Sequence, residues 1–376
     1  MSPGPPTVLH VGHHPQPGGG FVDLVTRVEG RESFSPDATN VVALLDSAPA
    51  CVDRARERLS APIEPIVGFG AGPVSPGDLA AALPRAGGVR RLYGLCKRYD
   101  VDLLHANDFR AGVVASIVAI LIGCPFVQHV HHTASHRNHP WLRQCLFRAA
   151  DTTIHVSEYT RRELADGDAD HVVVRSPIDV TDFRSRSADP DALAETYVRH
   201  GRPTVALIGR LAPNKGHKPF IRTATEVDAN FLVVGSGDDT ARSELESLVE
   251  GLGVSDRVTF TGFWEKVVDV YALADVVVVP SHDENLPKVI QEALAWKVPV
   301  VASRSGGIPE LVADERTGLL VNPDDDGTGL ATAIERLLAD EAFAETLATA
   351  GHDQLRSEFD IAVVSERLED VYETVV

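Results

Sequence analysis

Short apolar runs recur along the whole chain, and a helical pattern follows most of them. Continuously apolar strands that alternate with helices are typical of parallel sheets buried on both faces. The first series of runs lies at residues 7–11, 40–45, 63–67, 101–105, 126–130, 152–156 and 172–174. We therefore predict that the first half of the chain is one doubly wound α/β domain.

A second series follows the polar segment SPIDVTDFRSRSAD at residues 176–189, which we interpret as a linker. Its runs lie at residues 204–208, 231–234, 258–261, 276–279, 298–302 and 318–321, and helices are predicted over 327–339, 341–355 and 361–374. Ligands bind beyond the carboxyl ends of the strands in doubly wound folds. The sequence thus predicts two Rossmann-like domains, residues 1–177 and 178–357, that face each other across a ligand-binding cleft.

The composition limits the class of protein and its partners. The 376 residues are 44% hydrophobic and 24% charged, which is typical of a soluble globular protein long enough for two domains. The net charge of −19 opposes binding to nucleic acid, because phosphate backbones attract clustered Lys and Arg. Scarce lysine and plentiful aspartate fit a GC-rich genome or a high-salt cytoplasm.

Targeting features favour a cytoplasmic location. The four cysteines form no C-x-x-C pair, which predicts neither a disulfide framework nor a zinc site and favours a reducing compartment. The N-terminus lacks the basic start and apolar core of a signal peptide. The longest apolar run, residues 111–122, is too short to cross a bilayer and is interpreted as a buried helix.

Two glutamates, Glu284 and Glu292, flank a predicted helix start. Pro287 suits the first turn of a helix, so Glu284 lies before the helix and Glu292 lies roughly 7.5 Å along its axis. The helix N-terminus between them favours phosphate. A nucleotide sugar offers sugar, diphosphate and ribose in this order. The alternative is an ordinary acidic helix start with a surface pair between Lys288 and Glu292.

Basic and glycine-rich turns follow other predicted strands. Arg210 and Lys215 lie in GRLAPNKG, residues 209–216, where an arginine fork and a lysine point charge suit a diphosphate. Glycine turns occur as VVGSGDD at residues 233–239 and as GHHPQPGGG at residues 12–20, before a helix predicted from Phe21. Such turns let a phosphate approach the backbone. The alternatives are a solvated basic loop and flexible glycine loops.

Two further clusters carry weaker signals. The histidines between residues 129 and 139 match no zinc spacing, so no metal is expected. Residues 136–148, HRNHPWLRQCLFR, are interpreted as an ordinary helix with arginine on its solvated side. The alternative is an amphipathic face that contacts a membrane or a lipid-linked acceptor.

The motifs GRLAPNKG, VVGSGD, VTFTG, ADVVVVPS, E-x7-E and PVVASRSGGIPELV occur in this order in the second half. In this order and spacing they resemble the C-terminal half of family 4 glycosyltransferases, which are retaining enzymes of the GT-B fold. The first half resembles the family more loosely, through the GGG loop, VDLLHAND, the strand ending at His131 and VSEYT. The resemblance implies an acceptor-binding first domain, a donor-binding second domain, and a last helix, residues 358–376, that crosses back to the first domain.

The resemblance also implies roles for individual residues. Arg210 and Lys215 would hold the donor diphosphate, and Glu292 would bind the ribose hydroxyls. Glu284 would face the transferred sugar, and His131 would contact the sugar or the acceptor. Arg210, Lys215, Glu284 and His131 are therefore the expected catalytic residues. The remaining expected donor contacts are Gly19, Gly20, Gly209, Gly235, Asn285, Leu286, Lys288 and Val289.

One stretch departs from the family's usual pattern. Asn285-Leu286-Pro287 replaces the Gly-Phe-Gly that usually follows the first glutamate, so it is interpreted as a subgroup marker near the sugar. The implied reaction is transfer of a sugar from a UDP- or GDP-sugar to a glycan or lipid-linked saccharide, on one face of the sugar and without a metal or other cofactor. Such an enzyme would lie in the cytoplasm or at the inner face of the membrane. The alternatives are a GT-B sugar-nucleotide epimerase and an inactive GT-B binding subunit.

Overall fold

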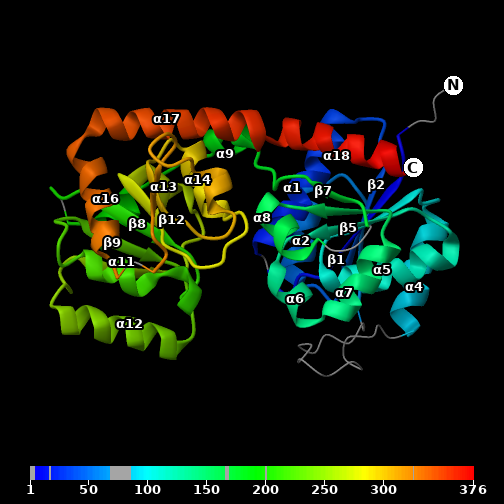
Figure 1. The fold of residues 1–376 in the computed structure, drawn as a ribbon, viewed down its shortest axis with the longest axis horizontal. Helices are drawn as coiled ribbons and strands as arrows, with labels where there is room; N and C mark the ends of the chain where they lie inside the picture. The colour runs from blue at the N-terminus through cyan, green and yellow to red at the C-terminus, as the bar shows by residue number, and fades with distance from the viewer. Residues whose placement is uncertain (1–4, 17, 68–85, 166–168, 200, 325) are drawn as a thin grey trace. The chain divides into compact units, whose positions relative to one another are not determined.

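The computed structural model describes residues 5–16, 18–67, 86–165, 169–199, 201–324 and 326–376 (Figure 1). Contacts divide the chain into two compact units, Met1–Asp179 with Phe359–Val376, and Val180–Glu358. Each unit is built on one parallel sheet. The prediction of two doubly wound α/β halves is therefore confirmed.

The first unit contains a seven-stranded sheet in the order β3-β2-β1-β4-β5-β6-β7. The strand order reverses next to β1, which pairs with β2 on one side and β4 on the other. The strands are β1 (Val8–Gly12), β2 (Asn40–Leu45), β3 (Ile63–Ile66), β4 (Leu103–Ala106), β5 (Phe126–Val130), β6 (Thr152–His155) and β7 (His171–Val173).

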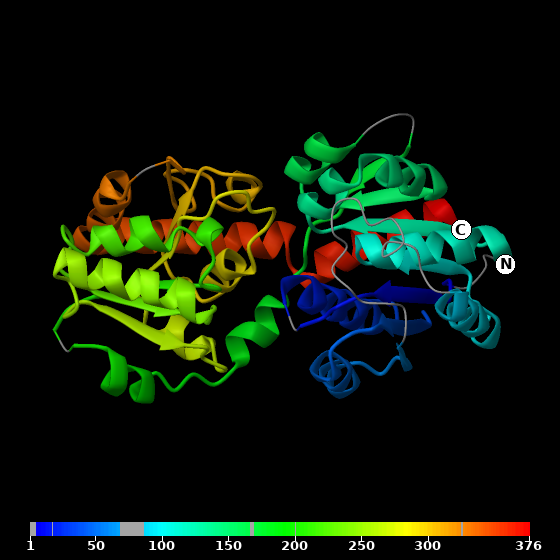
Figure 2. The ribbon, with the colours of Figure 1, turned by 90° about the horizontal axis from the view of Figure 1, so that it is seen from below.

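Helices cover both faces of this sheet (Figure 2), because successive side chains of a strand point to opposite faces. Leu9 and Val41 pack against α4, α5 and α7, whereas Val42 and Leu44 pack against α1 and α2. The helices are α1 (Gly19–Phe34), α2 (Pro49–Arg58), α4 (Ala86–Arg98), α5 (Phe109–Ile122), α6 (Thr133–Asn138), α7 (Pro140–Ala149), α8 (Glu158–Leu164) and α18 (Ile361–Val375).

The last helix, α18, belongs to the first unit although it is far away in sequence. Arg31 of α1 forms an ion pair with Glu369 of α18, with 2.6 Å between Nε and Oε1. Three side chains of α18 are buried against the strands, and burial of a large apolar side chain contributes about 1.5–3 kcal/mol. They are Val364, Leu368 and Tyr372. The predicted return of the last helix to the first domain is confirmed.

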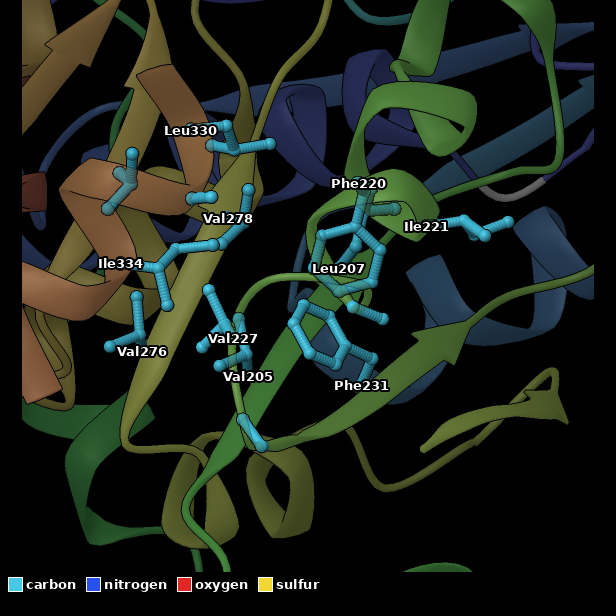
Figure 3. Close-up of a cluster of buried hydrophobic side chains, with 14 of the residues drawn as sticks. Val205, Leu207, Phe220, Ile221, Val227, Phe231, Val276, Val278, Leu330 and Ile334 are labelled. Atoms are coloured by element: carbon cyan, nitrogen blue, oxygen red, sulfur yellow. The ribbon is translucent and has the colours of Figure 1, made fainter. Parts of the chain in front are cut away.

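The second unit contains a six-stranded parallel sheet in the order β10-β9-β8-β11-β12-β13, which reverses next to β8. Its core (Figure 3) joins strands to helices on one face, and Phe220 packs edge-on against Phe231 with ring centroids 5.2 Å apart. The strands are β8 (Thr204–Ile208), β9 (Asn230–Val234), β10 (Val258–Gly262), β11 (Val276–Val279), β12 (Val300–Ser303) and β13 (Leu319–Val321).

The helices of the second unit cover its sheet and connect its strands. They are α9 (Val180–Ser185), α10 (Asp191–Tyr197), the short 3-10 turn η1 (Pro213–Lys215), α11 (His217–Thr223), α12 (Asp239–Leu252), α13 (Val268–Leu273), α14 (Lys288–Ala295), α15 (Ile308–Leu311), α16 (Thr328–Ala339) and α17 (Glu341–Glu358). Among the described residues, none of the helices combines the length and the hydropathy needed to cross a bilayer.

Three local predictions were wrong. The segment taken as a linker contains α9, because Val180 and Phe183 lie three residues apart on one helix face and are both buried. Residues 136–148 are divided between α6 and α7, since Pro140 begins a new helix. The helix predicted from Phe21 already begins at Gly19.

Candidate donor site and histidine cluster

Two turns meet at the carboxyl ends of β8 and β11, the neighbouring strands where the sheet order reverses. They are the basic turn, residues 209–216, and the glutamate turn, residues 280–287. The N–H of His282 donates to the carbonyl of Asn214 at 2.8 Å and joins the two turns. Lys215 Nζ forms an ion pair with Glu284 Oε1, and both side chains are partly exposed. Two residues that are 69 positions apart are thus brought together at the place where doubly wound folds bind ligands.

Glycines allow these turns to pack closely. Gly216 follows Lys215 with φ +72°, and a Cβ there would collide with the carbonyl oxygen of Pro280. A Cβ at Gly307 would collide with the carbonyl oxygen of Asn285. The Gly307 N–H donates to the carbonyl of Glu284 at 2.7 Å. The backbone at Gly307 therefore packs against the glutamate turn and fixes its position.

Glu292 lies inside α14 and is held by a buried tyrosine. The Tyr271 hydroxyl donates to Glu292 Oε2 at 2.6 Å. Burial raises the pKa of Glu292 above its ordinary value, and the Tyr271 hydrogen bond, Lys288 and Arg186 oppose that shift. Burial and the nearby glutamate raise the pKa of Tyr271 well above its ordinary value, so its hydroxyl stays protonated. One oxygen of Glu292 is thus fixed by the protein.

The N-terminus of α14 lies between the two glutamates, as the spacing predicted. Pro287 is the N-cap residue and no side chain caps the helix. Lys288 and Val289 are half-buried in the first turn, and Leu286 is buried just before it. Backbone N–H groups of this turn suit an anion.

Arg210 and the two strand-end glycines lie beside this turn. Arg210 is exposed and directly follows β8 and Gly209. The N–H of Gly209 donates to the carbonyl of Val234 at 2.9 Å, and Gly235 packs against the carbonyl oxygen of Gly209. The predicted residues of the second unit therefore converge on the ends of β8, β9 and β11.

The predicted glycine loop of the first unit has a different structure from the one expected. Gly19 and Gly20 form the first turn of α1, which no side chain caps and which carries no acidic residue. His14 lies beside this turn, and its buried Nε2 has no hydrogen-bond partner among the described residues. The loop prediction is corrected to an uncapped helix N-terminus, which suits an anion through its N–H groups.

His131 is held in a buried cluster that the sequence did not reveal. Its Nδ1 lies 3.3 Å from Asp23 Oδ2 and its Nε2 lies 3.4 Å from a guanidinium nitrogen of Arg27. Its ring stacks on that of His129, with centroids 4.5 Å apart. Arg27 also donates to the Asp23 carboxylate and to the side-chain Oδ1 of Asn107. Asp23, Arg27 and Asn107 come from α1 and the end of β4.

The direction of the hydrogen bonds in this cluster follows from Arg27, which can only donate. Arg27 lies 3.5 Å from Nε2 of His129, so that nitrogen accepts and the proton of His129 lies on Nδ1. Nδ1 of His129 then donates to Nε2 of His105 at 3.1 Å, and Nδ1 of His105 donates to the Tyr372 hydroxyl oxygen. A chain of neutral imidazoles joins α1 to α18.

Burial keeps these imidazoles uncharged. It lowers the pKa of His10 to about 3 and that of His14 to about 4. It also lowers the pKa values of His105, His129 and His131 well below the ordinary value, and the charge of Arg27 adds to the effect.

The same cluster has the spacing of a metal site. Asp23, His129 and His131 each offer one ligand atom, and these atoms lie within 4.8 Å of one another. However, Arg27 contacts all three side chains. A permanent guanidinium charge repels a metal cation, so we interpret the cluster as a buried ion pair with histidine partners.

Comparison with known proteins agrees with the geometry of both units. Residues 47–182 match the family described as Glycosyltransferase Family 4, and residues 202–340 match Glycosyl transferases group 1. The chain is 31% identical over 310 residues to the alpha-maltose-1-phosphate synthase of Mycolicibacterium smegmatis, covering 73% of this chain and 79% of the relative. The chain belongs to glycosyltransferase family 4.

Other relatives and solved structures agree with this assignment. This glycosyltransferase is 30% identical over 327 residues to the D-inositol 3-phosphate glycosyltransferase of Corynebacterium diphtheriae, covering 76% of this chain and 74% of the relative. The crystal structure of Anabaena HepE in complex with UDP and glucose superposes with a TM-score of 0.84 at 23% identity, covering 98% of this chain and 100% of HepE. The fold of this glycosyltransferase is GT-B.

Proposed function

We propose that this glycosyltransferase transfers a sugar, with retention of anomeric configuration, from a UDP- or GDP-sugar to a saccharide or lipid-linked acceptor. The second unit would bind the donor and the first unit the acceptor. Two relatives support the donor class: HepE is described in complex with UDP-glucose, and a Mycolicibacterium smegmatis relative, 35% identical over 222 residues, is named a GDP-mannose-dependent mannosyltransferase. Family membership supports a transferase over an epimerase.

The observation that carries the proposal is the ion pair between Lys215 and Glu284 at the ends of β8 and β11. A donor diphosphate would attract Lys215 and release the Glu284 carboxylate toward the sugar hydroxyls. Arg210, exposed on the same turn, adds a second fixed charge. A diphosphate in this place would also meet the uncapped N-terminus of α14.

These groups suit the charge that develops during transfer. When the anomeric C–O bond breaks, the sugar ring gains positive charge and the diphosphate oxygen gains negative charge. Lys215, Arg210 and the backbone N–H groups of α14 would stabilise that oxygen. The acceptor oxygen would then bond to the anomeric carbon on the same face, and the departing phosphate oxygen would take its proton. No protein nucleophile is needed.

The two glutamates would act on different parts of the donor. Tyr271 occupies one oxygen of Glu292, so the other can accept hydrogen bonds from ribose hydroxyls. Because Glu292 lies inside α14 and Glu284 lies before it, Glu292 would contact the ribose and Glu284 would contact the sugar. His131 would contact the sugar or the acceptor with the uncharged face of its ring, because Asp23 and Arg27 occupy its two nitrogens.

The variant Lys215→Ala tests the proposal. We expect kcat/KM to fall by about 100-fold or more, which is the usual cost of removing one preorganised charge-stabilising group. Thermal stability should change little, because a partly exposed ion pair contributes about 0–1 kcal/mol. Lys218→Ala, at an exposed position three residues on, is the matched control and should retain activity.

The same pair of variants separates binding from catalysis. Titration with UDP, GDP and ADP should raise the melting temperature of the unsubstituted chain for at least one nucleotide. That shift should shrink in Lys215→Ala and persist in Lys218→Ala. An unchanged shift together with unchanged turnover in Lys215→Ala would place the diphosphate elsewhere and reject the assignment.

A further inference from the structure

A second candidate site lies in the second unit at the other end of α14. A cavity of about 480 Å³ is lined by residues of α9 and α17 and by Lys297, which follows α14. Helix α14 packs against both α9 and α17, and the three lie close together (Figure 1). Eight residues of α14 separate this cavity from the Glu284 turn, which corresponds to about 12 Å of helix. The cavity is therefore distinct from the donor site.

The cavity concentrates positive charge in a strongly acidic chain. Arg184, Lys297 and Arg356 line it together with His352, whereas the whole chain has a net charge of −19. Burial lowers the pKa of His352, the hydrogen bond to the Leu294 carbonyl opposes that shift, and the charges of Lys297 and Arg184 lower the pKa further. The Asp353 carboxylate is also near enough to act on His352 and offsets part of this charge.

Helix capping explains only part of this cluster. Arg184 donates to the Ala295 carbonyl at 3.0 Å, and His352 Nδ1 donates to the Leu294 carbonyl at 3.1 Å, so both satisfy the C-terminus of α14. Arg184 has five N–H donors, and only one of them is used in this bond. Lys297 and Arg356 are exposed and form no ion pair within the described part of the chain. The charges of Lys297 and Arg356 and the remaining N–H donors of Arg184 are therefore available to a ligand.

We propose that this cavity, which we call the α9/α14/α17 pocket, binds a phosphate monoester. The guanidinium groups of Arg184 and Arg356 match a phosphate by paired N–H donors, and Lys297 adds a point charge. The hydroxyl of Thr181 lines the same cavity and can donate to a phosphate oxygen. The hydroxyl of Ser185 donates to the Asp182 carbonyl at 2.8 Å, so it can only accept, from a hydroxyl of the ligand.

The size of the cavity favours a phosphorylated molecule over inorganic phosphate alone. Pockets for small molecules commonly enclose about 300–1,000 Å³, and this one falls within that range. Nδ1 of His352 carries the proton that bonds to Leu294, so its Nε2 is an acceptor that suits a hydroxyl of the same ligand. A sugar phosphate or a phosphate headgroup of a lipid offers both chemistries.

Calorimetric titration of the full chain with glucose 6-phosphate tests the pocket, with glucose as the uncharged control. The double variant Lys297→Glu/Arg356→Glu reverses two exposed charges, so the fold should be retained, and circular dichroism checks this. Arg222→Glu, exposed on α11, makes the same kind of charge change away from the pocket. Lys215→Ala serves as the donor-site control.

We expect glucose 6-phosphate to bind the unsubstituted chain, the Arg222→Glu chain and the Lys215→Ala chain with similar affinity. Binding to the double variant should be at least about tenfold weaker. Equal binding to the double variant would overturn the proposal, and so would a loss confined to Lys215→Ala, because the phosphate would then occupy the donor site.

Vesicles that contain phosphatidic acid distinguish the two sources of the phosphate monoester. Co-sedimentation of the unsubstituted chain but not of the double variant would assign the pocket to a lipid headgroup. Binding of glucose 6-phosphate without co-sedimentation would assign it to a soluble metabolite. If neither probe binds, the proposal is wrong. The outcome does not depend on the transfer reaction, which the nucleotide titrations test separately.

Discussion

Acidification is expected to destabilise the first unit through its buried histidines. Each is neutral in the folded chain because burial lowers its pKa, whereas in the unfolded chain its pKa returns to about 6.5. The second unit contains His217 and His352 with lowered pKa values. In the described part of the first unit, burial lowers the pKa values of His10, His14, His105, His129 and His131.

The sign of the effect follows from proton binding in the two states. Above pH 6.5 neither state holds the extra proton, so the stability contribution is fully present. As the pH falls below 6.5, the unfolded chain binds protons that the folded chain excludes, and the free energy of unfolding decreases. Between pH 7 and pH 5 each histidine contributes about 2 kcal/mol to this decrease. Five together reach about 10 kcal/mol as an upper bound, comparable with the whole stability of a domain, about 5–15 kcal/mol.

Hydrogen exchange between pH 7 and pH 5 can measure this effect in each unit. Peptides from β1, β4 and β5 should lose protection at a higher pH than peptides from β8 and β11. His10→Gln removes one titrating group, so the slope of unfolding free energy against pH should fall by about 1 kcal/mol per pH unit. His132→Gln, at an exposed position, is the matched control. An unchanged slope in His10→Gln, or stability that rises on acidification, would refute the reasoning.

Three other changes test separate features of the molecule. Gly307→Ala should abolish donor binding and lower the melting temperature, because the new Cβ would collide with the Asn285 carbonyl oxygen. Gly251→Ala on α12 is the control, because its Cβ would meet nothing within 4 Å, and its free energy of unfolding should stay unchanged or rise by up to about 1 kcal/mol. Tyr372→Phe should cost about 1–3 kcal/mol in chemical denaturation, because it leaves the buried Nδ1–H of His105 without an acceptor, and a cost near zero would contradict the assigned hydrogen bond. The net charge of −19 predicts that activity increases with KCl, and full activity without salt would exclude adaptation to a salt-rich cytoplasm.

The strands could be predicted from the sequence because both sheets are buried on both faces. The predicted bounds Asn40–Leu45, Phe126–Val130, Thr204–Ile208 and Val276–Val279 are those observed, since each run has apolar residues on both sides of the strand. Helix α9 was missed because only Val180 and Phe183 mark its buried face within a polar segment. Six residues provide too short a pattern for helical periodicity.

The meeting of Lys215 and Glu284 was easier to predict than the histidine cluster. Motifs near Lys215 and Glu284 lie directly after apolar strands, and parallel strands bring their carboxyl ends to one edge. Nothing local marks Asp23 and Arg27, which lie inside α1 and meet His129 and His131 only through the fold. Contacts over 102 and 104 residues leave no trace in spacing or composition.

The position of α18 has a consequence for how the chain folds during synthesis. The second unit is continuous in sequence, from Val180 to Glu358, and it is inserted into the first unit between Asp179 and Phe359. A continuous unit can fold as it leaves the ribosome. The first unit instead lacks the partner of Val8, Leu103 and His105 until α18 has been made. The apolar strands of the first unit are translated first but therefore remain exposed to solvent the longest. Chaperones that act on the nascent chain would bind to these strands.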